Sequence, residues 1–168
     1  MKFPAVNPDL RRRAATGLLC GLLALSVSAQ DGPGSHEYRA DGETTIETLN
    51  GVRVITLRDN VFVRQNEVEL TGDVAVLEYD LDNQLQKVTL TGTPARFAQQ
   101  AENTASAVSG YSDTIHYFAG VQAVVEFVGS ASFSQPGTSL RCAQIRHTIE
   151  TGATSGQACS GSLSPQTN

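Results

Sequence analysis

Two neighbouring carboxylates offer the first candidate for acid–base or cation chemistry in this sequence. Asp80 and Asp82 lie in a polar segment that also contains Asn83. A carboxylate pair could bind a cation or exchange a proton. Asp and Asn also favour turns, because their side chains bond to nearby backbone groups, and a turn explains this cluster better.

The three histidines are too widely spaced in the sequence to resemble a set of metal ligands. His116 alternates with Ile115 and Tyr117, so a strand there would place its ring on the face opposite theirs. His147 ends an alternating segment and is interpreted as a wall or rim residue, while His36 is isolated near the N-terminus. Gly-x-Ser-x-Gly, P-loop and His-Glu-x-x-His motifs are absent. We therefore predict no enzymatic activity, no catalytic residue, no metal site and no cofactor.

Two cysteines follow the N-terminal region, and their positions are consistent with a disulfide. Cys142 and Cys159 are equally distant from the midpoint between Glu150 and Thr151, so a hairpin turning there would place them directly opposite each other. Facing residues in an antiparallel pair approach to about 4.5 Å between Cα atoms, close to the range that a disulfide accepts. We predict a Cys142–Cys159 bridge; two buried free thiols are the alternative.

The N-terminus has the composition of a signal peptide. Lys2 and three arginines at 11–13 precede an apolar stretch over 14–28, and Val27-Ser28-Ala29 supplies small residues for cleavage. The apolar stretch is short for a bilayer, which requires about 20 residues. We predict that residues 1–29 are a signal peptide and that the protein is periplasmic. A retained membrane anchor is the alternative.

The charge of the remaining chain excludes some partners. Removal of the first 29 of 168 residues would leave 139, with 8 of the 12 basic and 16 of the 17 acidic residues, for a net charge of −8. Such a surface repels nucleic acid and anionic membranes, so no nucleic-acid partner is expected. An acidic lipid would have to be held by its tails.

The pattern of the mature chain predicts strands throughout. Residues 30–41 are rich in Gly, Asp, Ser and Pro and are interpreted as a flexible lead-in, with a flexible tail over 162–168. A helix is not supported over 99–108, which we interpret as a loop. Segments dense in β-branched and apolar residues lie at 51–57, 61–64, 67–79, 85–91 and 121–128. Turn-forming pieces separate them: Arg-Asp-Asn, Asp-Leu-Asp-Asn, Thr-Gly-Thr-Pro and Gly-Ser.

A short motif recurs three times. Asn60, Gly92 and Gly129, which are 32 and 37 residues apart, each open a segment whose apolar residues fall two positions apart. A repeat of this length made only of strands indicates hairpins stacked along one axis. We expect two facing sheets with one continuous interior, in a single domain over 42–161.

The motifs, in their order, resemble those of one known family. They are Asn60-Val61-Phe62-Val63-Arg64-Gln65 followed by Leu70 and Asp73, then Gly92-Thr93-Pro94-Ala95-Arg96-Phe97, Gly110 to Tyr117, and Val128-Gly129-Ser130-Ala131-Ser132-Phe133. Over about residues 46–161 the chain resembles the OstA-like (LptA-like) family of periplasmic lipopolysaccharide-transport proteins. It departs from the family pattern at Asp59, where Gly is usual, at Gly72, where Ala is usual, and in having the two cysteines.

The resemblance implies a slightly twisted, open β-jellyroll that carries lipopolysaccharide and bridges the inner and outer membranes. Members hold the lipid A acyl chains between two sheets, stack head to tail, and contact inner-membrane and outer-membrane transport components. Strand parity and the family motifs together give the expected lipid-binding groove: Ile46, Leu57, Val61, Val63, Leu70, Phe97, Ile115, Tyr117, Phe127, Phe133 and Ile145.

Two other functions fit the same residues. A membrane-anchored inner-membrane component of the same pathway (LptC-like) would keep its N-terminal segment. A structural β-assembly protein would use its sheet edges and would have an ordinary core without a lipid ligand.

Overall fold

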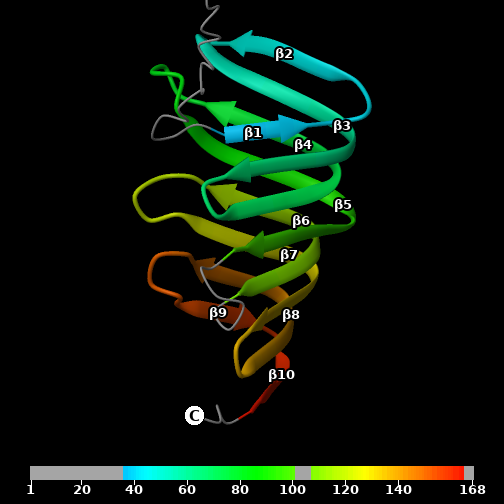
Figure 1. The fold of residues 1–168 in the computed structure, drawn as a ribbon, viewed down its shortest axis with the longest axis vertical. Coiled ribbons are helices and arrows are strands. Elements are labelled where there is room, and N and C mark those ends of the chain that lie inside the picture. The colour runs from blue at the N-terminus through cyan, green and yellow to red at the C-terminus, as the bar shows by residue number, and fades with distance from the viewer. Residues whose placement is uncertain (1–35, 101–106, 165–168) are drawn as a thin grey trace, which may run out of the picture. The chain divides into compact units, whose positions relative to one another are not determined.

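The computed structural model describes residues 36–100 and 107–164, and these form strands and turns without any helix. The strands are β1 (His36–Arg39), β2 (Thr44–Leu49), β3 (Val52–Gln65), β4 (Val68–Tyr79), β5 (Leu85–Gln99), β6 (Val108–Phe118), β7 (Val124–Gln135), β8 (Thr138–Thr148), β9 (Thr154–Gln157) and β10 (Ser160–Leu163). All pairings are antiparallel, and consecutive long strands are neighbours in the order β3 to β8 (Figure 1). The predicted all-β open jellyroll is confirmed.

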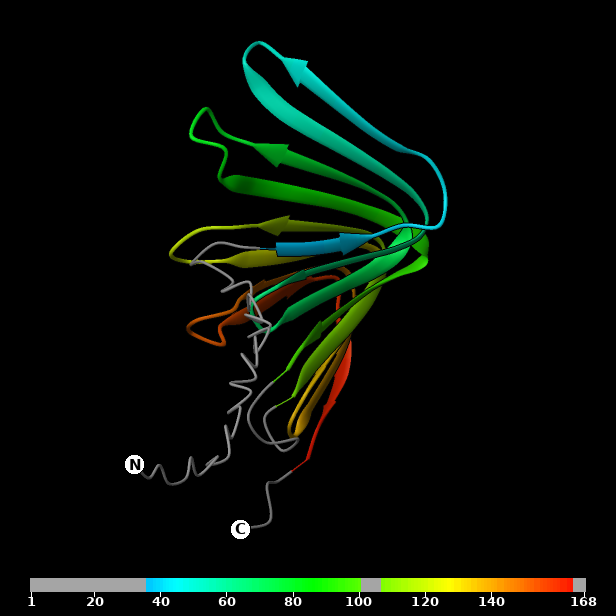
Figure 2. The same cartoon turned by 45° about the horizontal axis from the view of Figure 1, so that its top comes forward.

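Each long strand bends near its middle and contributes to two facing layers. Figure 2 shows the strands meeting at the bend on one side and diverging on the other. We name the layers by their edge strands. The β2–β9 arm contains residues 44–49, 52–58, 74–79, 85–91, 114–118, 124–128, 144–148 and 154–157. The β1–β10 arm contains residues 36–39, 61–65, 68–72, 95–99, 108–112, 131–135, 138–142 and 160–163.

The bends are β-bulges, which corrects part of the sequence interpretation. The pieces Arg-Asp-Asn, Thr-Gly-Thr-Pro and Gly-Ser do not end strands as predicted; they lie inside β3, β5 and β7, where the pairing register shifts. Asp59 and Asn60 have φ of 63° and 48°, and Gly129 and Ser130 have φ of 79° and 49°. Bulges and turns require the same left-handed backbone and therefore select the same residue types, which is why the sequence did not separate them.

The core lies between the two arms. Side chains alternate along each strand, and the bend keeps inward-facing residues on the interior side of both halves. The inward parity changes across the bend in β4, β5, β6 and β8, and it stays the same in β3 and β7, where two residues are added at the bulge. In β3, for example, Ile55 and Leu57 face inward before the bulge, and Val61 and Val63 face inward after it. This arrangement positions the candidate groove residues.

Both ends of the domain contain short strands that the sequence did not predict. His36–Arg39, assigned to the flexible lead-in, pairs as β1 with the second half of β3. Ser162 and Leu163, assigned to the flexible tail, belong to β10, which pairs with β8. The side chains of both strands are mostly exposed, and the strands are held by backbone pairing. Their sequences therefore lack the alternation of apolar and polar residues that indicates a half-buried strand. The predicted signal peptide, residues 30–35 and residues 165–168 lie outside the described part of the chain, as do residues 101–106 of the predicted loop.

Candidate functional site

The interior between the arms contains ten of the eleven residues expected to line a groove. Phe127, Phe133, Ile115, Leu57 and Ile145 are fully buried, and the other five are no more than 4% exposed: Val61, Val63, Leu70, Phe97 and Tyr117. They come from six strands and from both arms. The structure therefore brings these residues together in one continuous apolar layer.

Ile46 is the exception, with 60% of its side chain exposed. It pairs directly with Ile55, so it is on the inward face of its arm. β2 is the edge of that arm, and no further strand covers it in the described residues. Tyr38, opposite Val63 at the edge of the other arm, is similarly 38% exposed. The inward face thus continues to an uncovered end of the stack.

Aromatic rings join the two arms at the centre of the interior. The ring of Phe97 meets that of Phe127 edge-on at a centroid distance of 5.7 Å, and Phe127 lies 6.0 Å from Phe133. Gly110 permits this approach, because a Cβ atom there would lie 2.6 Å from Cε1 of Phe127 and 2.9 Å from the carbonyl oxygen of Ser132. The interior is therefore packed with side chains in this conformation, and a guest molecule would have to part the arms.

Polar contacts between the arms lie on the side opposite the bend. The Tyr117 hydroxyl donates to Oε1 of Gln65 at 2.9 Å, and the Tyr79 hydroxyl is hydrogen-bonded to Nε2 of His36. Burial raises the pKa of each tyrosine to about 12, so both hydroxyls remain protonated. A hollow of about 250 Å³ beside Gln65 and Tyr117 is also lined by Val68. These bonds must break if the interior opens on that side.

Some interior residues were not singled out from the sequence. Val88, Leu90 and Val125 are fully buried and follow the alternation of β5 and β7, so strand parity could have identified them. His147 is only 1% exposed, and burial lowers its pKa. Alternation along β8 predicts a wall position for His147, but no pattern in the sequence indicates that its ring is almost fully buried.

The carboxylates considered first have a structural role. Asp80 begins the β4–β5 turn: its Oδ1 accepts the Gln84 amide at 2.8 Å, and its Oδ2 accepts from Nε2 of Gln86 at 2.8 Å. This confirms the predicted turn. Within residues 36–100 and 107–164, no group of His, Cys, Asp and Glu could hold a metal ion. In the same ranges, no helix is long and apolar enough to cross a membrane.

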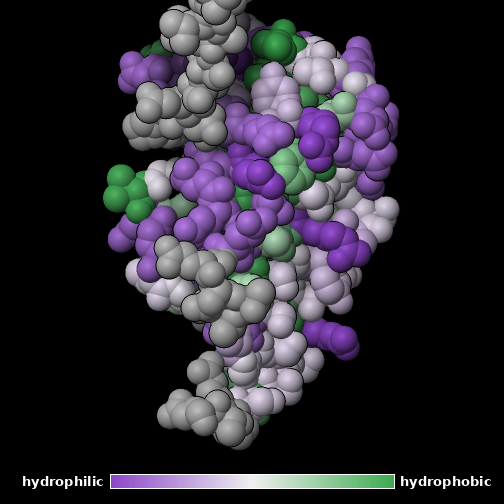
Figure 3. All heavy atoms as spheres, in the orientation of Figure 1, coloured by the Kyte–Doolittle hydropathy of each residue, from purple (hydrophilic) through white to green (hydrophobic). Residues whose placement is uncertain are grey.

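Charged residues lie on the outward faces and form ion pairs there. Examples are Arg64 with Glu69 at 2.6 Å, Lys87 with Glu78 at 3.6 Å, and Arg146 with Glu126. Figure 3 shows hydrophilic side chains over much of the face in view, with hydrophobic ones in scattered places. The apolar surface is thus concentrated between the arms.

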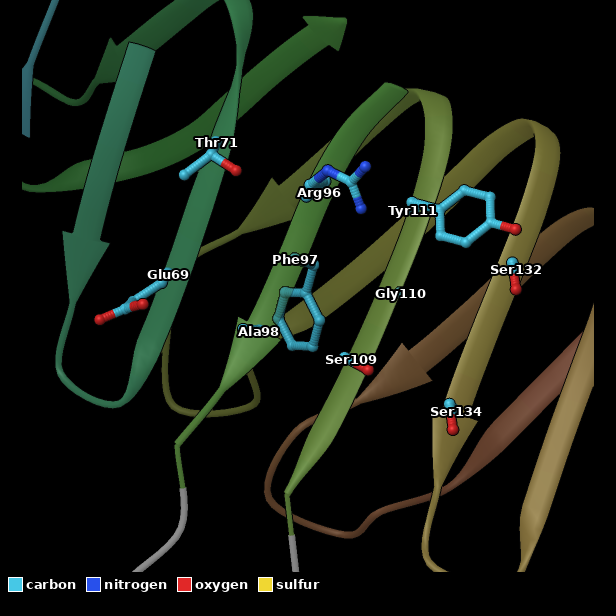
Figure 4. Close-up of a pocket in the computed structure, with 10 residues that line it drawn as sticks. All are labelled: Glu69, Thr71, Arg96, Phe97, Ala98, Ser109, Gly110, Tyr111, Ser132 and Ser134. Carbon is cyan, nitrogen blue, oxygen red and sulfur yellow. The ribbon is translucent and has the colours of Figure 1, made fainter. Parts of the chain in front are cut away.

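One hollow, of about 320 Å³, lies on the outward face of the β1–β10 arm (Figure 4). Outward-facing Arg96, Tyr111 and Ser132 line it, and Phe97 and Gly110 also contribute. Arg96, Tyr111 and Ser132 are direct cross-strand partners on β5, β6 and β7. This hollow is distinct from the apolar interior.

The disulfide prediction is confirmed. Cys142 and Cys159 are bonded, with their Cα atoms 4.1 Å apart. The register is also the predicted one, since Gln144 pairs with Gln157 on either side of the Glu150–Thr151 midpoint. The bridge fixes the last strand of the stack to β8.

Three comparisons with known proteins agree with this fold. A family model described as LptA/(LptD N-terminal domain) LPS transport protein matches residues 39–153. The lipopolysaccharide export system protein LptH of Pseudomonas aeruginosa is 29% identical over 92 residues, which are 55% of this chain and 52% of that protein. The chain therefore matches about half the length of this curated relative. The crystal structure of LptH, described as the LptA homologous periplasmic component of the conserved lipopolysaccharide transport device of that organism, aligns with a TM-score of 0.69 and 24% identity. That alignment covers 80% of this chain and 99% of the other.

Proposed function

Because the chain belongs to the LptA/LptD N-terminal-domain family of lipopolysaccharide transport proteins, we propose that it is a non-catalytic periplasmic carrier of lipopolysaccharide. Its two arms hold the acyl chains of lipid A between them. The observation that carries this proposal is the continuous apolar interior, to which both arms and every long strand contribute.

Burial of acyl chains supplies the binding energy in this proposal. Each methylene removed from water contributes about 0.8 kcal/mol, so a few chains outweigh the repulsion between an anionic lipid and an acidic protein. The interior side chains already contact one another, as Phe97 and Phe127 do. Lipid therefore replaces contacts between the arms with contacts to each arm, and entry requires the Tyr117–Gln65 bond to open.

Crosslinking from two adjacent residues tests whether lipid occupies the interior. Tyr117 faces inward, and the neighbouring His116 faces outward on the same strand. A photo-reactive residue at Tyr117 is expected to crosslink to lipopolysaccharide in cells at least about tenfold more than one at His116, because successive strand residues point to opposite faces. Immunoblotting and mass spectrometry of the adduct provide the measurement.

Equal crosslinking from the two positions would contradict lipid binding between the arms. Absence of any adduct and of any co-purified lipid would support a structural β-assembly protein instead. Recovery of the full-length chain only in the membrane fraction, with no mature N-terminus near Gln30, would support the anchored, LptC-like alternative.

We further propose that the protein bridges inner-membrane and outer-membrane transport components and associates with itself head to tail. Supporting features are the short edge strands at both ends, β1 with β2 and β9 with β10. Edge strands offer unpaired backbone groups, and a heterologous contact between two different edges need not close at a dimer.

A proline at the β2 edge tests this association. The two-residue loop Asn50–Gly51 has φ of 53° and 85°, and the flanking Leu49–Val52 pair is of the hydrogen-bonded type, so the amide of Thr48 points to the free edge. Thr48→Pro should shorten the concentration-dependent oligomers, while Thr48→Ala should not. Analytical ultracentrifugation gives the size distribution. A wild-type protein that remains monomeric at millimolar concentration would refute the self-association.

A further inference from the structure

His147 is a polar side chain enclosed in the apolar interior. It lies on β8 in the β2–β9 arm, is 1% exposed, and packs against Phe133 of the other arm at a centroid distance of 4.9 Å. Its Nδ1 is 2.9 Å from Oγ1 of Thr154 on β9. Its Nε2 is buried and has no hydrogen-bond partner in the described part of the chain.

The neighbouring hydroxyl favours one position of the imidazole proton. Thr154 donates its single hydroxyl proton to the carbonyl oxygen of Gly152 at 3.3 Å. The hydroxyl oxygen is then the acceptor in its contact with His147, so Nδ1 carries a proton and donates. Burial lowers the pKa of His147, which keeps the ring neutral near neutral pH. In a neutral ring protonated on Nδ1, Nε2 is a hydrogen-bond acceptor.

Within residues 36–100 and 107–164, no donor lies within hydrogen-bond distance of this atom. The Ser112 hydroxyl, the other buried polar side chain of the interior, donates to the carbonyl oxygen of Thr114. Tyr117 donates to Gln65. Buried acceptors in folded proteins are nearly always paired, so an unpaired one facing an apolar interior indicates a donor that arrives with a guest.

We propose that Nε2 of His147 accepts a hydrogen bond from a hydroxyl group on a bound acyl chain, and that His147 makes the interior selective for hydroxylated over unsubstituted chains. This inference rests on the proposed function, because it requires acyl chains between the arms. Phe133 and the surrounding apolar residues contact the hydrocarbon, and His147 binds a hydroxyl group at one position along it.

Two fatty acids that differ by one hydroxyl group provide the test. Tetradecanoic acid and 3-hydroxytetradecanoic acid compete with a fluorescent fatty acid for the purified mature protein. Wild type should prefer the hydroxylated probe by about fivefold, the effect of one neutral hydrogen bond. His147→Phe should bind tetradecanoic acid as well as wild type does and lose the preference. His116→Phe, on the outward face, should keep the preference.

A second variant leaves the histidine in place. Thr154→Val removes the hydrogen-bond partner of Nδ1, so the ring is no longer held in the orientation that presents Nε2 to the interior, and the preference should fall even if His147→Phe folds poorly. Equal affinity of wild type for the two probes, or a preference that survives both substitutions, would overturn the role of His147 while leaving acyl binding intact. Failure of wild type to bind either probe would instead overturn the proposed function.

Discussion

Replacing Phe97 with aspartate is expected to abolish lipid retention and to lower the free energy of unfolding by more than about 3 kcal/mol. Phe97 is 2% exposed and meets Phe127 across the interior. The substitution removes that contact and leaves a carboxylate where neither the other arm nor an acyl chain can solvate it. Urea denaturation and quantification of co-purified lipopolysaccharide give the two measurements.

Two further variants separate a charged interior from an unfolded protein. Arg96→Asp changes the adjacent, outward-facing residue and should leave both stability and lipid retention nearly unchanged. Ile46→Asp places a carboxylate on the inward face at the uncovered end, where it remains hydrated, so the fold should persist while lipid retention falls several-fold. A folded Phe97→Asp protein that retains lipid at the wild-type level would contradict binding between the arms.

Removal of the disulfide is expected to cost about 3 kcal/mol of unfolding free energy, the loop-closure entropy for a bridge that spans 17 residues. Cys142 is buried in β8, and Cys159 lies between β9 and β10, so the bond restrains both short strands at once. The double variant Cys142→Ser with Cys159→Ser should unfold at a lower urea concentration than the oxidised wild type.

The loss should be local as well as global. Amide exchange in β9 and β10 should accelerate more than in β4 and β5, at the centre of the stack, because the bridge lies at the terminal edge. Wild type measured with a reducing agent is the matched control and should behave like the double serine variant. A difference below about 1 kcal/mol between oxidised and double-variant protein would refute this estimate.

Features encoded within one hairpin could be predicted from the sequence. The facing positions of Cys142 and Cys159 followed from the turn at Glu150–Thr151, and the Asp80 turn followed from its residue types. Inward positions such as Val61 and Phe97 followed from alternation combined with the family motifs. Each of these depends on neighbours in the chain, where residue type and spacing are informative.

Features that depend on pairing across the fold could not be predicted. The strand β1 is polar and exists because the second half of β3 offers it an edge. Tyr117 and Gln65 are 52 positions apart in sequence and meet only because both strands bend. Whether Asn60 would begin a new strand or continue an old one depends on the bulge, and its residue type is suited to either.

The bulges have a consequence for the length of the molecule. Every long strand crosses the bend and supplies one segment to each arm. Each added strand therefore contributes to both sides of the interior. Such a chain can gain or lose whole hairpins without a change in the cross-section of the interior between the arms. Duplication of one hairpin would thus lengthen the apolar interior while leaving its cross-section unchanged.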